Sequence, residues 1–350
     1  MLTERSYLNL DRFGFVKSNS LLHSSNDAPK KEEISEHRAR KIAQKENKRT
    51  DKWRIMLHRN EDIDRVVLTS EFSRRVRKGI PEALRGYIWI NYLLKITDQD
   101  RSWAADILRE APKILSEKET GKDALQAISL DVPRTFPQHI FFQSSLGQSL
   151  LNSVLSGYAS IDEEVGFCQG MSFVTAMLLM YASDVESLCI LREIMTKPKW
   201  VMRELYKPGM PYVNLRLYQY ERTLKRVLPD ISKKFEALQF IPSMYAPSWF
   251  TTIFTYNFPF SLVVRVWDIF LFKGWSIVIS VAVAFWKFHR KVILSLTTFE
   301  SLYEKLRMLL AEFPSERVDE IIDDGYYISR KYASDEQLSE LEKDFSASKA

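Results

Sequence analysis

The sequence predicts an all-α protein built around one large multi-helix domain. Glycine (11) and proline (13) are scarce among its 350 residues, which argues against a loop-rich β architecture. Several apolar series recur at gaps of three and four residues, the spacing of one helix face. No segment alternates apolar and polar residues as a strand would, and no repeat has a fixed period. We therefore expect a dozen or more helices and no sheet.

The N-terminal extension, residues 1–69, has two parts of different composition. Residues 1–30 are polar, and we expect them to be poorly ordered. Residues 31–58 are charged and lack Gly and Pro, which favours a solvated helix leading into the domain. The same residues would also suit contact with acidic lipid or protein. Because few apolar residues there could join a core, removal of residues 1–60 should leave the domain folded.

The domain is expected to span residues 70–335, with residues 336–350 as a C-terminal tail. Its first clear helix lies within residues 77–95. There Gly79 and Pro81 suit a turn and a first helical position, and the apolar residues that follow keep helical spacing.

Two further helices are expected in the middle of the chain. Residues 146–158 suit a helix that ends at Gly157. Residues 162–182 begin with three acidic residues, which favour a helix N-terminus through the helix dipole. On that helix Gln169 would point away from the apolar stripe that begins at Phe167, because two residues turn about 200°.

The C-terminal half continues the helical pattern. Pro229 closes an amphipathic segment with apolar gaps of four and three. Ser261 suits the start of the next helix and Gly274 its end, and a nearly all-apolar, buried helix follows. The helices expected here cover residues 212–228, 261–273, 276–294 and 297–313.

Charge and cysteine content exclude several classes of protein. The net charge of +5, from 50 basic and 45 acidic residues, gives no support for a nucleic-acid binder. Cys168 and Cys189 lie in apolar stretches, so we expect a reducing compartment and no disulfide framework. The N-terminus does not resemble a signal peptide, and the apolar runs fall short of the ~20 residues of a membrane span. We expect a cytoplasmic protein, with peripheral contact to endomembranes left open.

The usual signatures of self-contained catalysis are missing from the sequence. There is no glycine loop ending in Gly-Lys-Ser/Thr, no Gly-x-Ser-x-Gly and no His-Glu-x-x-His. Five scattered histidines show no metal-ligand spacing. We therefore expect no cofactor and no metal bound by the chain itself.

One arginine is held between two prolines in DVPRTFP, residues 131–137. Pro133 fixes the backbone before Arg134, and Pro137 restricts the residue before it, so the arginine leaves a stiff loop. Asp131 could grip the guanidinium with two hydrogen bonds. The alternative is an ordinary surface pair of Asp131 and Arg134, which would contribute little.

A second polar residue, Gln169, stands beside Gly170 in VGFCQGMSF. A glycine removes a side chain and lets a partner approach closely. The alternative is a glutamine that caps a helix or satisfies backbone groups in the core.

Five motifs follow one another along the chain. They are RKGIPEALRGYIW with Arg85, Gly86 and Trp89, ISLDVPRTFP with Ile128, Asp131 and Arg134, GFCQGM with Gln169, SWF at 248–250 and RVWDIFLFKG at 265–274. The order of these motifs resembles the TBC domain, the family of GTPase-activating proteins for Rab GTPases. The resemblance covers about residues 70–335. Phe167 stands where the family more often has tyrosine, so the ring is kept and a hydroxyl is lost.

The resemblance implies a GTPase-activating protein that completes the active site of a Rab. Arg134 would be an arginine finger that stabilises charge on the phosphates, and Gln169 a second finger that orients the attacking water. The GTP-bound Rab would carry GTP and Mg²⁺. Asp131 would hold Arg134 from behind, and Arg85 would either tie helices together or line the Rab surface. The remaining supporting residues are Thr135, Phe167 and Gly170.

Two other classes of function compete with this interpretation. A TBC-like domain without activity would be a Rab-binding scaffold, but both finger residues are present here. A helical adaptor would contact a membrane or a partner through residues 31–58. In an adaptor, Arg134 would have no effect on any nucleotide reaction.

Overall fold

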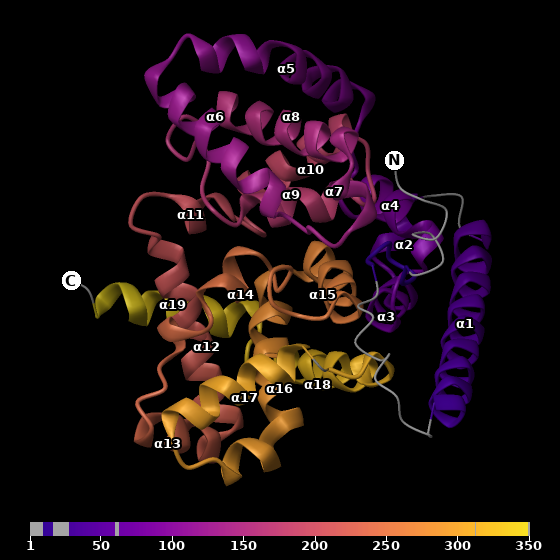
Figure 1. Cartoon of the computed structure of the whole chain (residues 1–350), viewed down its shortest axis with the longest axis vertical. Helices are drawn as coiled ribbons and strands as arrows, with labels where there is room; N and C mark the ends of the chain where they lie inside the picture. Colours follow the sequence, from indigo (N-terminus) through magenta and orange to yellow (C-terminus); the bar gives the residue numbers. More distant parts are fainter. Residues whose placement is uncertain (1–9, 17–27, 60–62, 312, 349–350) are drawn as a thin grey trace.

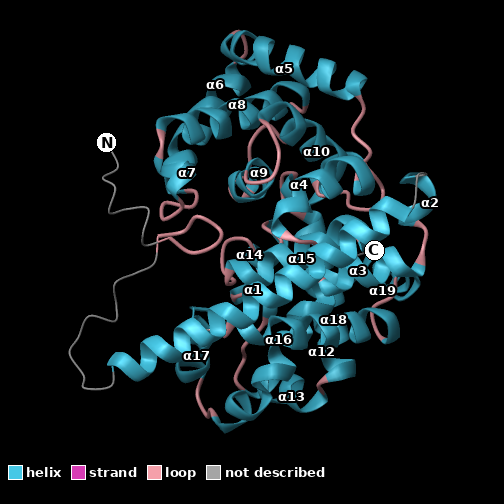
Figure 2. Ribbon diagram, turned by 90° about the vertical axis from the view of Figure 1, so that its right-hand side faces the viewer, coloured by secondary structure: helices cyan, strands magenta, loops and turns pink. Residues whose placement is uncertain are grey.

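The computed structural model describes residues 10–16, 28–59, 63–311 and 313–348, and these residues confirm the all-α fold. Figure 2 shows helices joined by loops and turns throughout this part of the chain. Within it, β-type pairing is limited to two isolated bridges, Leu10 with Val16 and Phe15 with His139.

The helices follow one another with short connections. Short 3₁₀ segments include η2 (Glu82–Leu84) and η4 (Val132–Arg134), and η3 (Trp89–Leu93) is a π-helix. The described α-helices are α1 (Ala28–Arg59), α2 (Ile63–Val67), α3 (Ser70–Lys78), α4 (Arg85–Ile88), α5 (Asp98–Ser116), α6 (Glu119–Asp131), α7 (Ile140–Gln143), α8 (Ser145–Ile161), α9 (Met171–Leu179), α10 (Asp184–Thr196), α11 (Arg203–Tyr206), α12 (Pro211–Val227), α13 (Pro229–Ala237), α14 (Pro247–Thr251), α15 (Phe260–Lys273), α16 (Trp275–Ser295), α17 (Phe299–Ala311), α18 (Val318–Lys331) and α19 (Asp335–Ala347).

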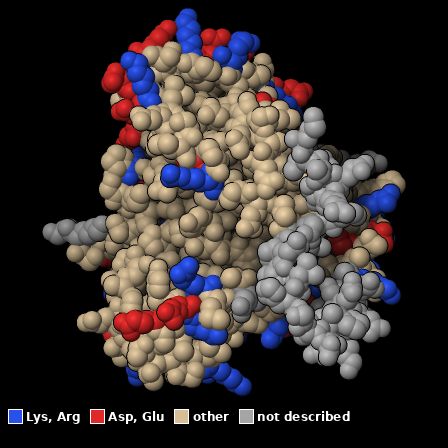
Figure 3. Space-filling view, in the orientation of Figure 1, with Lys and Arg blue, Asp and Glu red and all other residues tan. Residues whose placement is uncertain are grey.

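The helices form two groups around one continuous core. Figure 1 shows α5 to α10 at one end of the molecule and α12, α13 and α16 to α18 at the other, with α14 and α15 between them. In the same orientation, charged side chains gather over the α5 end, whereas the middle of this face carries few (Figure 3). Buried apolar side chains run from α3 through α8, α9 and α15 to α18, so the two groups share one core.

Helices with strong apolar periodicity lie where the sequence predicts them. Residues 212–228 correspond to α12, and Pro229 begins the next helix. Residues 276–294 lie in α16, whose residues from Trp275 to Trp286 are all buried, because this helix is apolar on every side. Residues 261–273 correspond to α15, which ends at Gly274 as expected. Its N-cap is Pro259, so the proposed cap at Ser261 is wrong.

The predicted helix end at Gly157 is also wrong. Helix α8 continues to Ile161, with Gly157 inside it. A Cβ at Gly157 would lie 3.0 Å from Cδ2 of Leu108 and 3.3 Å from Cδ2 of Leu188. The glycine therefore serves the close packing of α8 against α5 and α10 and does not end a helix.

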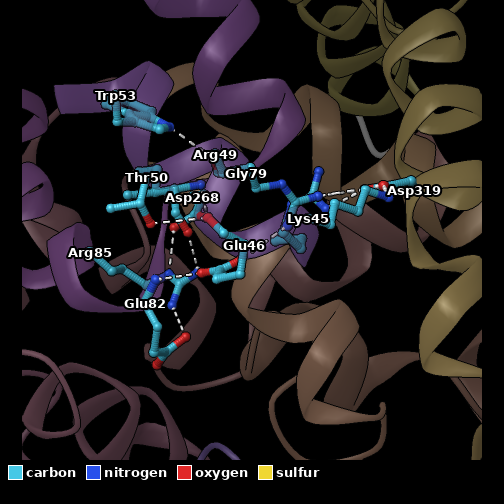
Figure 4. Close-up of polar contacts among 12 residues, drawn as sticks. Lys45, Glu46, Arg49, Thr50, Trp53, Gly79, Glu82, Arg85, Asp268 and Asp319 are labelled. Carbon is cyan, nitrogen blue, oxygen red and sulfur yellow. Dashed lines mark hydrogen bonds and ion pairs between the residues drawn. The ribbon is translucent and has the colours of Figure 1, made fainter. Parts of the chain in front are cut away.

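The N-terminal extension joins the core. The expected helix at residues 31–58 is present as α1, but Trp53 and Met56 on it are buried. The indole Nε1 of Trp53 donates to the carbonyl of Gly79 at 3.0 Å, and Figure 4 draws this contact. The expectation that few residues of this region could reach the core is therefore wrong.

Polar contacts reinforce the docking of α1. The Glu46 carboxylate accepts a hydrogen bond from the backbone N–H of Glu82 at 2.8 Å. Lys45 and Arg49 both pair with Asp319 at the start of α18 (Figure 4). These contacts tie the helix to both ends of the domain sequence.

The sequence predicts poor order for all of residues 1–30. Residues 10–16 instead form a tight turn that packs on the domain, and residue 28 begins α1. The rest of that prediction, on residues 1–9 and 17–27, lies outside the described residues.

The expected C-terminal tail contains another packed helix. Helix α19 starts with a capping box formed by Ser334 and Gln337, and its Leu338 and Leu341 are buried. Gln219 on α12 donates to the carbonyl of Leu338 at 2.8 Å. The core therefore extends beyond residue 335.

Candidate functional site

Arg134 lies at the end of η4, in the loop that joins α6 to α7 (residues 132–139, the arginine loop). Its side chain is exposed, and among the described residues it forms no hydrogen bond or ion pair. The predicted pair with Asp131 is therefore wrong. An exposed guanidinium without a partner among the described residues can bind an anion from another molecule.

The Asp131 carboxylate turns into the protein, away from Arg134. It accepts a hydrogen bond from the hydroxyl of Ser172 on α9, and both residues are buried. The carbonyl of Asp131 accepts from the hydroxyl of buried Thr135 at 3.0 Å. Asp131 and Thr135 thus support the arginine loop, but through its backbone and through α9.

Phe136 anchors the arginine loop two residues after Arg134. Its φ angle is +47°, a left-handed conformation that costs a non-glycine residue about 1–3 kcal/mol. The buried ring is surrounded by other aromatic rings, which hold this conformation. The centroid distances are 5.5 Å to Phe15, 6.0 Å to Phe142, 5.3 Å to Phe173 and 6.1 Å to Phe260.

Gln169 lies in a turn and not in the helix that the sequence predicted. Helix α8 ends at Ile161 and α9 begins at Met171, which leaves residues 162–170 as a connection, the glutamine turn. Gly166 (φ +54°) and Gly170 (φ +105°) interrupt any helix there. The angular argument for Gln169 is therefore wrong, although its side chain is exposed.

The acidic residues of the glutamine turn pin it to the domain. The carboxylate of Asp162 accepts from Tyr158 at 2.8 Å and from two nitrogens of Arg203 at 2.7 and 2.8 Å. Burial alone would raise the pKa of Asp162, but the hydrogen bonds from Arg203 and Tyr158 hold the pKa below its usual value. Asp162 thus closes α8 and does not start a new helix.

Gly170 and Phe167 have structural roles beside Gln169. Gly170 is the N-cap of α9, and its positive φ is what requires glycine. An added Cβ would meet Thr252 at 3.4 Å, which is ordinary contact. The expectation that Gly170 lets a partner approach is therefore replaced by a backbone requirement. Phe167 is half-buried and packs against the core.

Buried contacts join the two loops. Asp131 lies three residues before Arg134 and Ser172 three residues after Gln169, and these two side chains are hydrogen-bonded. The rings of Phe136 and Phe173 form a second contact between the two loops, with centroids 5.3 Å apart. The structure thus brings the arginine loop and the glutamine turn side by side with both tips exposed.

Arg85 does not belong to this site. It is buried, and its Nε donates to the carboxylate of Asp268 at 3.0 Å, while Nη2 donates to the carbonyl of Ile80 at 2.7 Å (Figure 4). Trp89 also donates to Asp268, at 3.0 Å. Of the two roles considered for Arg85, tying helices together is the one observed.

Sequence reasoning missed three residues near the two loops. Phe136 and Ser172 stand beside the motif residues, but their role depends on partners about 40 positions away. Tyr256 is 59% exposed, with its ring 5.0 Å from that of Phe173. An exposed tyrosine next to the joined loops adds an apolar surface with a polar tip.

The described residues offer no other obvious chemistry. They contain no group of three or more His, Cys, Asp and Glu residues that could hold a metal ion. No helix among them is both long and apolar enough to cross a lipid bilayer.

Comparisons with known proteins agree with this architecture. The human ecotropic viral integration site 5 protein homolog is 31% identical over 299 residues, 85% of this chain and 35% of that protein. The Rab GTPase-activating protein tbc-11 of Caenorhabditis elegans is 34% identical over 219 residues, 61% of this chain and 22% of that protein. The chain thus spans about a third or less of the length of these relatives.

A solved structure and a family model complete the comparison. The crystal structure of the Chlamydomonas flagellar RabGAP TBC domain aligns with a TM-score of 0.65 at 20% identity, covering 91% of this chain and 98% of that one. This likeness supports the fold. The model of the Rab-GTPase-TBC domain matches residues 82–294, more than half of the chain. The chain therefore belongs to the Rab-GTPase-TBC domain family.

Proposed function

We propose that this protein accelerates GTP hydrolysis by a Rab GTPase, with Arg134 and Gln169 entering the Rab active site. The observation that carries the proposal is an exposed arginine, on a loop anchored by buried contacts, that has no partner in the part of the chain that the structure describes. The family supports the choice of a Rab as partner, and one relative is named a Rab GTPase-activating protein.

Arg134 suits the electrostatic part of the reaction. In phosphoryl transfer to water, negative charge spreads over the phosphate oxygens, and catalysis consists mainly of positioning and charge stabilisation. The guanidinium is planar, always charged and donates several hydrogen bonds at once. An arginine finger supplied by a partner increases the rate about 10³–10⁵-fold, which corresponds to roughly 4–7 kcal/mol of barrier.

Gln169 suits the orientation of the attacking water. Its amide can accept a hydrogen bond from the water and donate another to a phosphate oxygen. The Rab in its GTP-bound form would bring GTP and Mg²⁺ as the substrate complex, and the protein would meet it on endomembranes. The chain would then need no cofactor of its own.

The anchoring of both loops fits this function. Because Asp131, Thr135 and Phe136 hold the arginine loop before any partner arrives, little conformational entropy is lost on docking. A mobile arginine would lose part of its rate advantage to that ordering cost.

Single-turnover GTP hydrolysis by a panel of purified, GTP-loaded Rabs tests the proposal. Wild type, Arg134→Ala and Gln169→Ala are compared, with circular dichroism to confirm folding. Arg109→Ala is the matched control, because Arg109 is also an exposed arginine, with 67% of its side chain accessible. Wild type and the control should accelerate at least one Rab, and both finger variants should lose most of that acceleration.

Two results would contradict the proposal. Full activity of Arg134→Ala would show that Arg134 does not act as an arginine finger. Rab binding without acceleration would instead support a silent Rab-binding scaffold.

A further inference from the structure

The N-terminal turn, residues 10–16, is a small closed unit. The carboxylate of Asp11 accepts hydrogen bonds from the backbone N–H groups of Phe13 (2.8 Å) and Phe15 (3.0 Å). The backbone closes the turn as well, with the N–H of Asp11 donating to the carbonyl of Phe15 at 2.8 Å. Gly14 takes a φ of +91°, which favours glycine. The turn presents two aromatic rings to the domain.

This turn docks on the second half of the arginine loop. The N–H of Val16 donates to the carbonyl of Gln138 at 2.9 Å, and the N–H of Ile140 donates to the carbonyl of Gly14 at 3.0 Å. These two hydrogen bonds bracket the bridge between Phe15 and His139. The contact begins four residues after Arg134.

The side chain of His139 is hydrogen-bonded directly to the backbone of the turn. Its Nε2 donates to the carbonyl of Phe13 at 2.8 Å, because a carbonyl can only accept, while Nδ1 accepts from the N–H of Phe141 at 3.3 Å. The imidazole is therefore neutral, and burial lowers its pKa. A Cβ on Gly14 would lie 2.9 Å from Nε2, so only glycine fits against this ring.

The aromatic contacts reach the strained residue of the arginine loop. The ring of Phe15 lies 5.5 Å from that of Phe136 and 5.0 Å from that of Phe260, and the ring of Phe13 also lies 5.0 Å from Phe260. Phe15 thus covers one side of Phe136, whose left-handed backbone reverses the chain just after Arg134. Loss of Phe15 would remove one of the contacts that hold this conformation.

We propose that the N-terminal turn positions the arginine loop, with Phe15 and Gly14 as its positioning residues. The kinetic part of this proposal rests on the proposed function, whereas its structural part does not. The competing role would be a cover over the site that a Rab must displace, and the two roles predict opposite changes in rate when the turn is released.

The test uses the full chain with Phe15→Ala and Gly14→Ala, which release the turn through different atoms. Phe345→Ala is the control, because its ring makes a comparable contact, 5.3 Å from Tyr218, on α19. Hydrogen–deuterium exchange of the Ile140 amide reports docking, and exchange of the Thr135 and His139 amides reports the arginine loop. Both turn variants should accelerate exchange at all three amides about 10-fold or more, and the control at none.

On the Rab that responds to wild type, kcat should fall about 10-fold in both turn variants, with KM changed less than about 3-fold. An unchanged or higher kcat would overturn the proposal, and the higher value would support a cover. Faster exchange at Ile140 alone would overturn it as well, since the loop would then hold itself. If wild type accelerates no Rab, the proposed function fails, and the exchange data still decide whether the turn holds the loop.

Discussion

The Ser172 hydroxyl donates a hydrogen bond to the Asp131 carboxylate and so joins the two loops that present Arg134 and Gln169. Ser172 is fully buried and Asp131 is 8% exposed, so water does not replace this contact. Asp131 is the last residue of α6 and Ser172 the second residue of α9. Displacement of either helix end would therefore move both loops.

Loss of this hydrogen bond should cost stability and activity together. Ser172→Ala leaves a buried carboxylate without its donor, so the free energy of unfolding should fall by about 1–3 kcal/mol. GTP hydrolysis by the responsive Rab should slow as well, since the loops lose their connection. Urea denaturation and single-turnover hydrolysis measure the two effects.

Ser187→Ala provides the control for this prediction. Ser187 is as buried as Ser172, but its hydroxyl has no hydrogen-bond partner among the described residues. It should lose much less stability and retain activity. Equal losses in the two serine variants would show that the bond to Asp131 contributes nothing special.

Helix α1 should be needed for stability, contrary to the expectation from the sequence. The Trp53 ring is 1% exposed, packs 5.5 Å from the ring of Phe72 and donates to the carbonyl of Gly79. Trp53→Ala should cost about 3–5 kcal/mol, and removal of residues 1–60 should cost more. Exposed Lys52 on the same helix gives the control, Lys52→Ala, with an effect within about 0.5 kcal/mol. An unchanged melting temperature of the truncated protein would restore the original expectation.

The sequence predicts helices well where one period dominates a long segment. The apolar series of α12 and the continuous apolar run of α16 leave little alternative. The prediction from the sequence fails at residues 162–170, where three acidic residues at the start suggest a helix. There two glycines with positive φ and the bonds from Arg203 to Asp162 impose a turn. These long-range contacts are invisible in a local pattern.

The exposure of Arg134 and Gln169 agrees with the sequence interpretation, but their supports were not predictable. The closeness of Asp131 and Arg134 in sequence predicts that they pair. The partner of Asp131 in the structure, Ser172, lies 41 positions away. The burial of Trp53 was missed for a similar reason, since a charged helix with few apolar residues gives no sign of what it packs against.

The buried pair of Arg85 and Asp268 should show strong coupling. Asp268 accepts from Arg85, Trp89 and the backbone of Ile80, and its side chain is inaccessible to solvent. Asp268→Ala removes the buried partner of Arg85, which keeps only its ion pair with Glu82, and leaves two N–H donors without their acceptor. It should cost about 3–5 kcal/mol.

The double variant Arg85→Met/Asp268→Ala separates the charge effect from the packing effect. It removes both charges, so it should be more stable than Asp268→Ala alone, although Trp89 and Ile80 still lose their acceptor. A double-mutant cycle in urea measures the coupling. If the losses in the free energy of unfolding of the single variants add up to that of the double variant, the charges of Arg85 and Asp268 are not coupled.

The free energy of unfolding should decrease as pH falls, because His289 binds a proton more readily in the unfolded chain. This residue of α16 packs between the rings of Phe285 and Phe288, each 4.8 Å away, and its Nε2 has no partner among the described residues. Burial, together with the charges of Lys305 and Arg317, lowers the pKa of His289 to about 4. The unfolded chain, with a histidine pKa of about 6.5, then binds more protons than the folded one as pH falls from 6.5 to 4.

His289→Phe isolates this effect. Below pH 4 both states carry the proton, so the wild-type loss should be complete there, reaching at most about 3 kcal/mol relative to pH 7. Phenylalanine cannot take up a proton, so the variant should lose less stability over the same range. Urea denaturation of both proteins at several values between pH 7 and pH 4 measures the difference. Parallel pH profiles would show that the pKa of His289 is the same in the folded and the unfolded state. Another group would then control acid stability.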